Sequence, residues 1–196
     1  MPTTITSLYA RRIAVAVAGL FAPTALLLAA APAGAVARDQ CRGTHAAPSA
    51  QTLHRAAGAV VCLVNAERAQ TGLRALRGDR DLRQAAGRHS RDMVRRGFFS
   101  HVTPSGANLS DRLRRTGYLR GRSAMQVGET LAIGTGRPAS PTRIVAAWIA
   151  SPEHHRVLLG SDFQEVGVGV AAGVPGSTGR RKSATYTLAT GVVDGG

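Results

Sequence analysis

One carboxylate in this chain occupies an unusual position. Apolar Val127, Leu131 and Ile133 alternate with small or polar residues, which is the period of a β-strand, and Glu129 falls on the same face as these three. Burying a carboxylate in apolar surroundings is costly unless it is paired, hydrogen-bonded or protonated, so on a buried face Glu129 needs a partner. On an edge position it would simply face water, and the strand period alone leaves both arrangements open.

Three histidines invite the same question about chemistry. His101 follows an aromatic pair directly, and His154 lies in the first turn of a helix that is predicted to start at Pro152 with Ser151 as its cap. The helix dipole disfavours a charged imidazole there, so His154 should stay neutral, as a hydrogen-bond acceptor or a metal ligand must be. His89 instead lies on an apolar helical face and is predicted to be a packed core histidine with a hydrogen-bonded ring nitrogen.

Periodic patterns predict the elements that carry these residues. Helices are expected to begin near residues 53, 79 or 81, 109, 141 and 152, and strands to cover 127–133, 166–170 and 186–192. Gly167 and Gly169 alternate with valines. This period favours a strand that another backbone approaches closely over a phosphate-binding loop.

Three ordered motifs connect these residues to a known family. They are Phe98-Phe99-Ser100-His101, Gly128-Glu129-Thr130-Leu131-Ala132 and the segment Trp148 to His154, which Val166-Gly167-Val168-Gly169 follows. Their order and spacing, from about Leu53 to Val193, resemble the CAP superfamily of cysteine-rich secretory proteins, antigen 5 and pathogenesis-related proteins, in its bacterial secreted branch. The resemblance implies an α+β fold: a three-layer α-β-α sandwich with a small central, mainly antiparallel sheet.

The same resemblance implies a polar cleft. Members carry two histidines and two acidic residues there, and His101, Glu129 and His154 match three of these four positions. Ser151 stands where the second glutamate would be. Glu153 is nearby and could compensate, but one residue along a helix rotates a side chain by about 100°, so Glu153 is not counted in the set. His101, Glu129 and His154 could hold zinc with one open position, or they could form a hydrogen-bond network that braces the cleft together with Ser151.

The N-terminal segment suggests export, and export bears on how the two cysteines are read. Arg11 and Arg12 precede an uncharged apolar run and small-residue cleavage sites, the layout of a signal peptide over residues 1–37, so no membrane span is expected in the mature chain. Cys41 and Cys62, the only cysteines, are then predicted to form a disulfide that ties a lead segment, 38–52, to the CAP domain, 53–196. Two isolated cysteines lack the close spacing of a zinc site.

The net positive charge of the chain indicates which kind of binding partner to expect. The chain has 25 Lys and Arg against 11 Asp and Glu, a net charge of +14, and only Arg11 and Arg12 precede Arg38, so the mature chain keeps +12. Such charge favours anionic envelope polymers or lipid headgroups, although an arginine-rich composition can also reflect coding bias. Export argues against nucleic acid.

Two function classes remain open at this stage. The first is a non-catalytic, secreted or envelope-associated module that binds lipid, a small apolar ligand or envelope material in the cleft. The second is a metal-assisted hydrolase in which Glu129 acts as the base. The sequence contains neither the G-x-S-x-G nor the H-E-x-x-H motif, and the resemblance indicates a fold more firmly than an activity.

Overall fold

A computed structural model describes residues 38–121, 126–177 and 182–192, all within the unit that spans Ala31–Gly196. The predicted signal peptide, 1–37, lies outside the described residues and remains a prediction. Within the described ranges, no helix combines the length and the hydropathy that crossing a bilayer requires.

Helices make up much of the described chain. They are α1 (Leu53–Gln70), α2 (Arg80–Arg96), α3 (Leu109–Thr116), α4 (Pro141–Ala150) and α5 (Pro152–Leu159), with the short 3-10 helices η1 (Arg38–Gln40) and η2 (Arg137–Ala139). Local capping explains several of these ends. Asp79 Oδ1 accepts the amides of Asp81 and Leu82 at 2.9 and 2.7 Å, and Asn108 forms a reciprocal capping box with Asp111.

The strands form one four-stranded sheet in the order β1-β3-β4-β2. The strands are β1 (Arg77–Gly78), β2 (Val127–Thr135), β3 (Glu165–Ala172) and β4 (Ser183–Gly191). β4 is antiparallel to both β2 and β3, whereas β1 adds a short parallel pair to β3. The sheet is therefore mainly antiparallel, as expected, but mixed because of β1.

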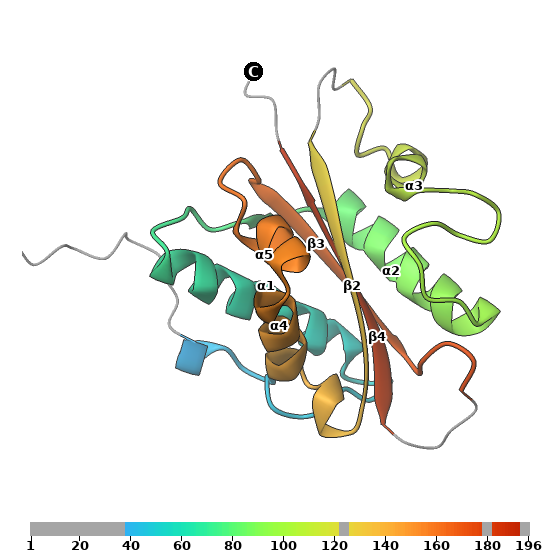
Figure 1. The fold of residues 1–196 in the computed structure, drawn as a ribbon, viewed down its shortest axis with the longest axis horizontal. Coiled ribbons are helices and arrows are strands. Elements are labelled where there is room, and N and C mark those ends of the chain that lie inside the picture. The colour runs from blue at the N-terminus through green and yellow to red at the C-terminus, as the bar shows by residue number, and fades with distance from the viewer. Residues whose placement is uncertain (1–37, 122–125, 178–181, 193–196) are drawn as a thin grey trace, which may run out of the picture. The chain divides into compact units, whose positions relative to one another are not determined.

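Helices cover both faces of this sheet, which gives the three layers that the resemblance implied (Figure 1). On one face, α1, α4 and α5 bury the larger core, which includes Trp148, Val168 and Tyr186. On the other face, α2 and α3 pack Leu82 and Leu113 against Tyr118 and Ala189. The predicted α+β sandwich is confirmed, and the face beneath α2 and α3 is the one that receives Glu129.

Gly167 and Gly169 let α2 lie directly on β3. A Cβ atom at Gly167 would overlap the backbone between Leu82 and Arg83, and one at Gly169 would overlap the backbone at Gly87. The two glycines thus serve close backbone approach, as the valine period predicted, and the approaching backbone is that of a helix. This contact holds α2 against the sheet.

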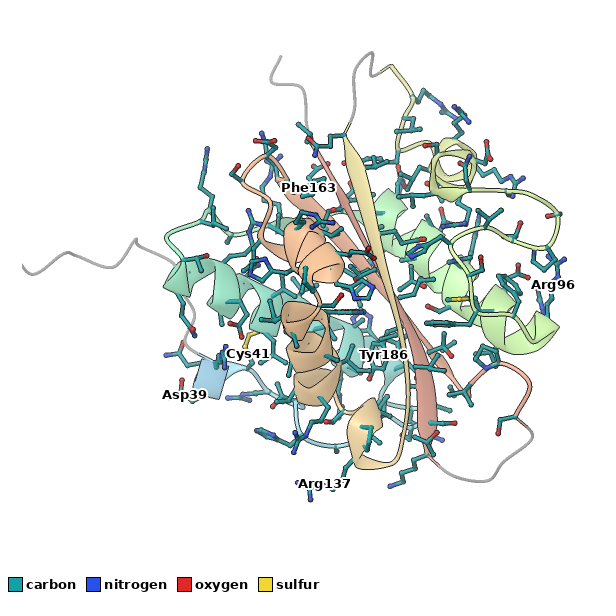
Figure 2. The ribbon with its side chains drawn as sticks, in the orientation of Figure 1. Asp39, Cys41, Arg96, Arg137, Phe163 and Tyr186 are labelled. Atoms are coloured by element: carbon teal, nitrogen blue, oxygen red, sulfur yellow. A yellow bond between two sulfur atoms is a disulfide. The ribbon has the colours of Figure 1, made fainter. Side chains whose placement is uncertain are left out.

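The predicted disulfide is present between Cys41 and Cys62, which are 21 residues apart in sequence with their Cα atoms at 5.7 Å. Cys41 is buried beside α1, where Figure 2 labels it. An ion pair between Arg38 and Glu67 adds a second tie to the same helix. The lead segment is therefore fastened to α1, as predicted.

Candidate functional site

Glu129 faces inward. It lies opposite Ala189 in the register of β2 and β4, so its side chain is on the face that α2 and α3 cover, and that side chain is only 4% exposed. The alternative of an edge glutamate in water is therefore wrong. A carboxylate so deeply buried needs partners, and two side chains supply them.

Arg112 from α3 provides the first partner. Its Nη2 donates to Glu129 Oε2 at 2.6 Å, and its Nη1 donates to the carbonyl of His101 at 2.8 Å and to that of Ala107 at 3.2 Å. The Arg112 side chain is 7% exposed, so this is a buried ion pair whose remaining donors are largely satisfied by backbone. Arg112 also fixes the loop between α2 and α3, because it holds the carbonyl of His101 in place.

His101 provides the second partner. Its Nδ1 lies 2.8 Å from Glu129 Oε1, and its side chain is 56% exposed. A carboxylate accepts, so Nδ1 carries the proton and, in the neutral ring, Nε2 is left as an acceptor. The hydrogen bond to Glu129 raises the pKa of His101, while partial burial opposes the increase. We refer to His101, Arg112 and Glu129 as the polar cluster.

His89 lies beside this cluster as a core residue, as predicted. It is 1% exposed, its Nε2 lies 3.0 Å from the carbonyl oxygen of Ser100, and its ring tilts against that of Phe98 at 5.9 Å between centroids. Burial lowers the pKa of His89. The ring is therefore neutral near pH 7 and braces the segment that leads to His101.

Among the described residues, no hydrogen bond joins His154 or Ser151 to the polar cluster. His154 is half-buried on α5 and has no hydrogen-bond partner among the described residues. Burial first, and then the charge of His101, lower its pKa, so the predicted neutral ring is consistent with its surroundings. Ser151 joins α4 to α5 and occupies the cap position without a capping bond from its side chain. Its part in the expected network stays a prediction.

The predicted zinc set of His101, Glu129 and His154 is not assembled here. Within the described part of the chain, no three His, Cys, Asp or Glu side chains are grouped to hold a metal ion. Both Glu129 oxygens are already engaged, and the Arg112 guanidinium at 2.6 Å would repel a divalent cation at that carboxylate. The residues present fit an internal ion pair and do not fit a metal.

Sequence reasoning missed Arg112. A signal for it existed: Leu109, Arg112, Leu113 and Thr116 follow the spacing of one helical face, so Arg112 occupies a position on the apolar side of a short helix. A cation at such a position requires a buried anion or several carbonyls. A cation on the apolar face of a neighbouring helix is thus a candidate partner for a buried carboxylate such as Glu129.

The polar cluster predicts opposite titration of two histidines. In an NMR titration, the pKa of His101 should lie above the ordinary histidine value of 6.5, and the pKa of His89 should lie below it. The His101–Glu129 contact then stabilises the fold fully below pH 6.5, and this stabilisation is lost as the pH rises through the raised pKa of His101. The burial of neutral His89 stabilises the fold above pH 6.5, and this stabilisation is lost as the pH falls through the lowered pKa of His89. Glu129→Gln should lower the pKa of His101; an unchanged pKa would show that the contact does not form in solution.

Comparison with known proteins identifies a family. Residues 61–187 match the model of the cysteine-rich secretory protein family, CAP. The chain is 32% identical over 131 residues to the uncharacterized protein YkwD of Bacillus subtilis (strain 168), an alignment that covers 67% of this chain and 48% of YkwD. It is 35% identical over 112 residues to the uncharacterized membrane protein YlbC of the same strain, covering 57% of this chain and 30% of YlbC. The chain thus spans about half the length of YkwD and less of YlbC.

Two solved structures share the fold. One is an extracellular protein containing an SCP domain from Bacillus anthracis str. Ames, with a TM-score of 0.59 and 24% identity, covering 74% of this chain and 44% of that chain. The other is an outer surface protein from Borrelia burgdorferi, with a TM-score of 0.59 and 18% identity, covering 77% of this chain and 99% of that chain. At these identities the likeness establishes the fold.

Proposed function

This chain belongs to the cysteine-rich secretory protein (CAP) family, and from the geometry of its polar cluster we propose that it acts outside the cell as a non-catalytic binding module. Two of the proteins that share its fold are described as extracellular or as an outer surface protein, which supports the extracellular setting. The predicted signal peptide and the disulfide that ties Cys41 to Cys62 are consistent with this setting.

The observation that carries the proposal is that the Glu129 carboxylate is buried and already paired. A general base must direct a lone pair at the proton that it removes, within hydrogen-bond reach. Glu129 is 4% exposed, and each of its oxygens already accepts a hydrogen bond, one from Arg112 and one from His101. The carboxylate therefore holds His101 in one orientation and is not available for proton transfer to a substrate.

The group that the cluster presents to solvent is the imidazole of His101. Its neutral form offers Nε2 as an acceptor for a hydroxyl or amide of a ligand, and its protonated form offers a donor to an anionic group. Beside it, Phe99 and Val102 are exposed at 46% each, so the same loop also presents apolar surface. A polar anchor next to exposed apolar side chains suits an amphiphilic ligand such as a lipid or other envelope material.

Mass spectrometry of the small molecules that co-purify with the protein tests this proposal. We expect a bound amphiphile whose occupancy falls several-fold in His101→Ala and stays unchanged in the control His155→Ala, which alters an exposed histidine on α5. An ester-hydrolysis assay on the same preparations tests the alternative, that the protein is a hydrolase. Turnover that His101→Ala abolishes and His155→Ala spares would overturn the proposal in favour of a hydrolase.

A further inference from the structure

The α2 and α3 helices enclose a second feature that the polar cluster does not explain. A groove of about 390 Å³ lies between them and is bounded by the loop that carries Thr103 and Ser105. Six arginines line it, four from α2 and two from α3: Arg88, Arg91, Arg95, Arg96, Arg112 and Arg115. We call it the arginine groove. Figure 2 labels Arg96 at the end of α2.

The positive charge of the arginine groove is largely uncompensated. Asp92 is the one acidic residue that lines it, and this carboxylate is shared by Arg95 at 3.4 Å and Arg96 at 3.3 Å. Among the described residues, Arg88, Arg91 and Arg115 have no ion pair, and all three are exposed. Like charges gathered on two facing helices repel one another, so an anion placed between them would be bound favourably.

Two of the residues that line the arginine groove, His89 and Arg112, carry a buried nitrogen without a hydrogen-bond partner in the described part of the chain. Arg112 Nε and His89 Nδ1 have no hydrogen-bond partner among the described residues, although both side chains are more than nine-tenths buried. In neutral His89, Nε2–H donates to the Ser100 carbonyl, so Nδ1 is an acceptor. Arg112 Nε–H is a charged donor, and leaving such a donor buried and unpaired is costly. The Nε–H of Arg112 is a donor that an anion bound at this side of the groove could satisfy, directly or through water.

We infer that the arginine groove binds consecutive phosphate groups of an extended, non-nucleotide anionic chain. Guanidinium groups pair with phosphate through two parallel hydrogen bonds, and the hydroxyls of Thr103 and Ser105 can donate as well. Along α2, Arg88 to Arg95 spans roughly 10 Å at the helical rise, which is long enough for more than one phosphate. This inference rests on the proposed binding function and adds the chemistry of one ligand.

Two observations separate such a chain from other anions. Nucleic acids bind single-stranded sites through bases that stack on aromatic rings, and His89, the one ring among the lining residues, is buried. A bilayer presents a flat surface, whereas these arginines lie along a groove with Arg112 buried beside them. Both features favour a flexible phosphate chain that can enter the groove.

Inorganic polyphosphate of defined length is the probe, and its affinity is measured across a range of salt concentrations. The groove variant Arg88→Ala/Arg115→Ala is compared with Arg137→Ala/Arg143→Ala, which removes the same charge from exposed positions in η2 and α4. We expect the groove variant to weaken binding at least about tenfold and to reduce the slope of log affinity against log salt by about 1.4, since each lost phosphate contact removes about 0.7 on single-stranded chains. The control should change affinity less than about threefold, with a slope close to wild type.

Equal losses in the two variants would overturn the inference, because net charge alone would then explain binding. It would also be overturned if anionic phosphatidylglycerol vesicles bound through these arginines while polyphosphate did not, or if single-stranded DNA bound much more tightly than polyphosphate. If the wild-type protein retains the co-purified amphiphile but does not bind polyphosphate, the inference about the arginine groove is wrong and the proposed binding function is unaffected. Equal melting temperatures of the variants confirm that each is folded.

Discussion

Replacing Arg68 with methionine should lower the free energy of unfolding by about 3–5 kcal/mol, although methionine fills much of the same volume. Arg68 lies in α1 and is 0% exposed. Its Nε donates to the carbonyl of Arg74 at 2.8 Å, its Nη1 to those of Leu158 at 2.8 Å and Gly160 at 3.0 Å, and its Nη2 to that of Phe163 at 3.3 Å.

The size of this effect follows from what the methionine leaves behind. Four backbone carbonyls lose their donor, and two of these hydrogen bonds are fully buried, where water cannot replace the arginine. Burial lowers the pKa of Arg68, but the guanidinium stays charged and the carbonyls stabilise that charge. Among the described residues Arg68 has no carboxylate partner, so its removal leaves no buried anion unpaired.

Urea denaturation of wild type, Arg68→Met and Arg74→Met measures the prediction. Arg74 is exposed, so its methionine variant tests the loss of one arginine charge without a change in the core and should shift stability by less than about 0.5 kcal/mol. If Arg68→Met cost less than about 1 kcal/mol, the carbonyls would have other donors in solution and the assignment of Arg68 as the tie between α1 and the α5–β3 connection would be wrong.

Glu129→Ala should be comparably destabilising, at about 3–5 kcal/mol, because it leaves the buried Arg112 guanidinium without its anion. A glutamate that only filled a polar hole would cost less, about 1–3 kcal/mol. Glu153→Ala removes an exposed carboxylate from α5 and provides the control, with an expected change below about 0.5 kcal/mol.

A double-mutant cycle with Arg112→Met distinguishes the ion pair from independent packing losses. Removing both partners takes away the uncompensated charge, so the double variant should recover at least about 1 kcal/mol relative to the sum of the single losses. The His101–Glu129 coupling should be smaller, since His101 is 56% exposed. Strict additivity of Glu129→Ala and Arg112→Met would show that the polar cluster does not act as a unit.

The sequence by itself predicted the parts of this protein that depend on neighbours along the chain. The helix starts expected near residues 79 and 109 are present, and the caps that form them, Asp79 and Asn108, bond to residues within a few positions. The valine period over residues 166–170 likewise marked a strand and the close approach at its glycines. Two cysteines in a chain with a predicted export signal left one simple pairing, and that pairing is present.

Only the tertiary structure decided the partners of the buried charges. Arg68 reaches carbonyls 90 to 95 residues away, and Arg112 reaches Glu129 across 17 residues from a different element. Periodicity shows which side of an element is buried, but it does not show which polar groups of other elements meet there. The charge of Glu129 is consequently balanced by an arginine that the motifs did not single out.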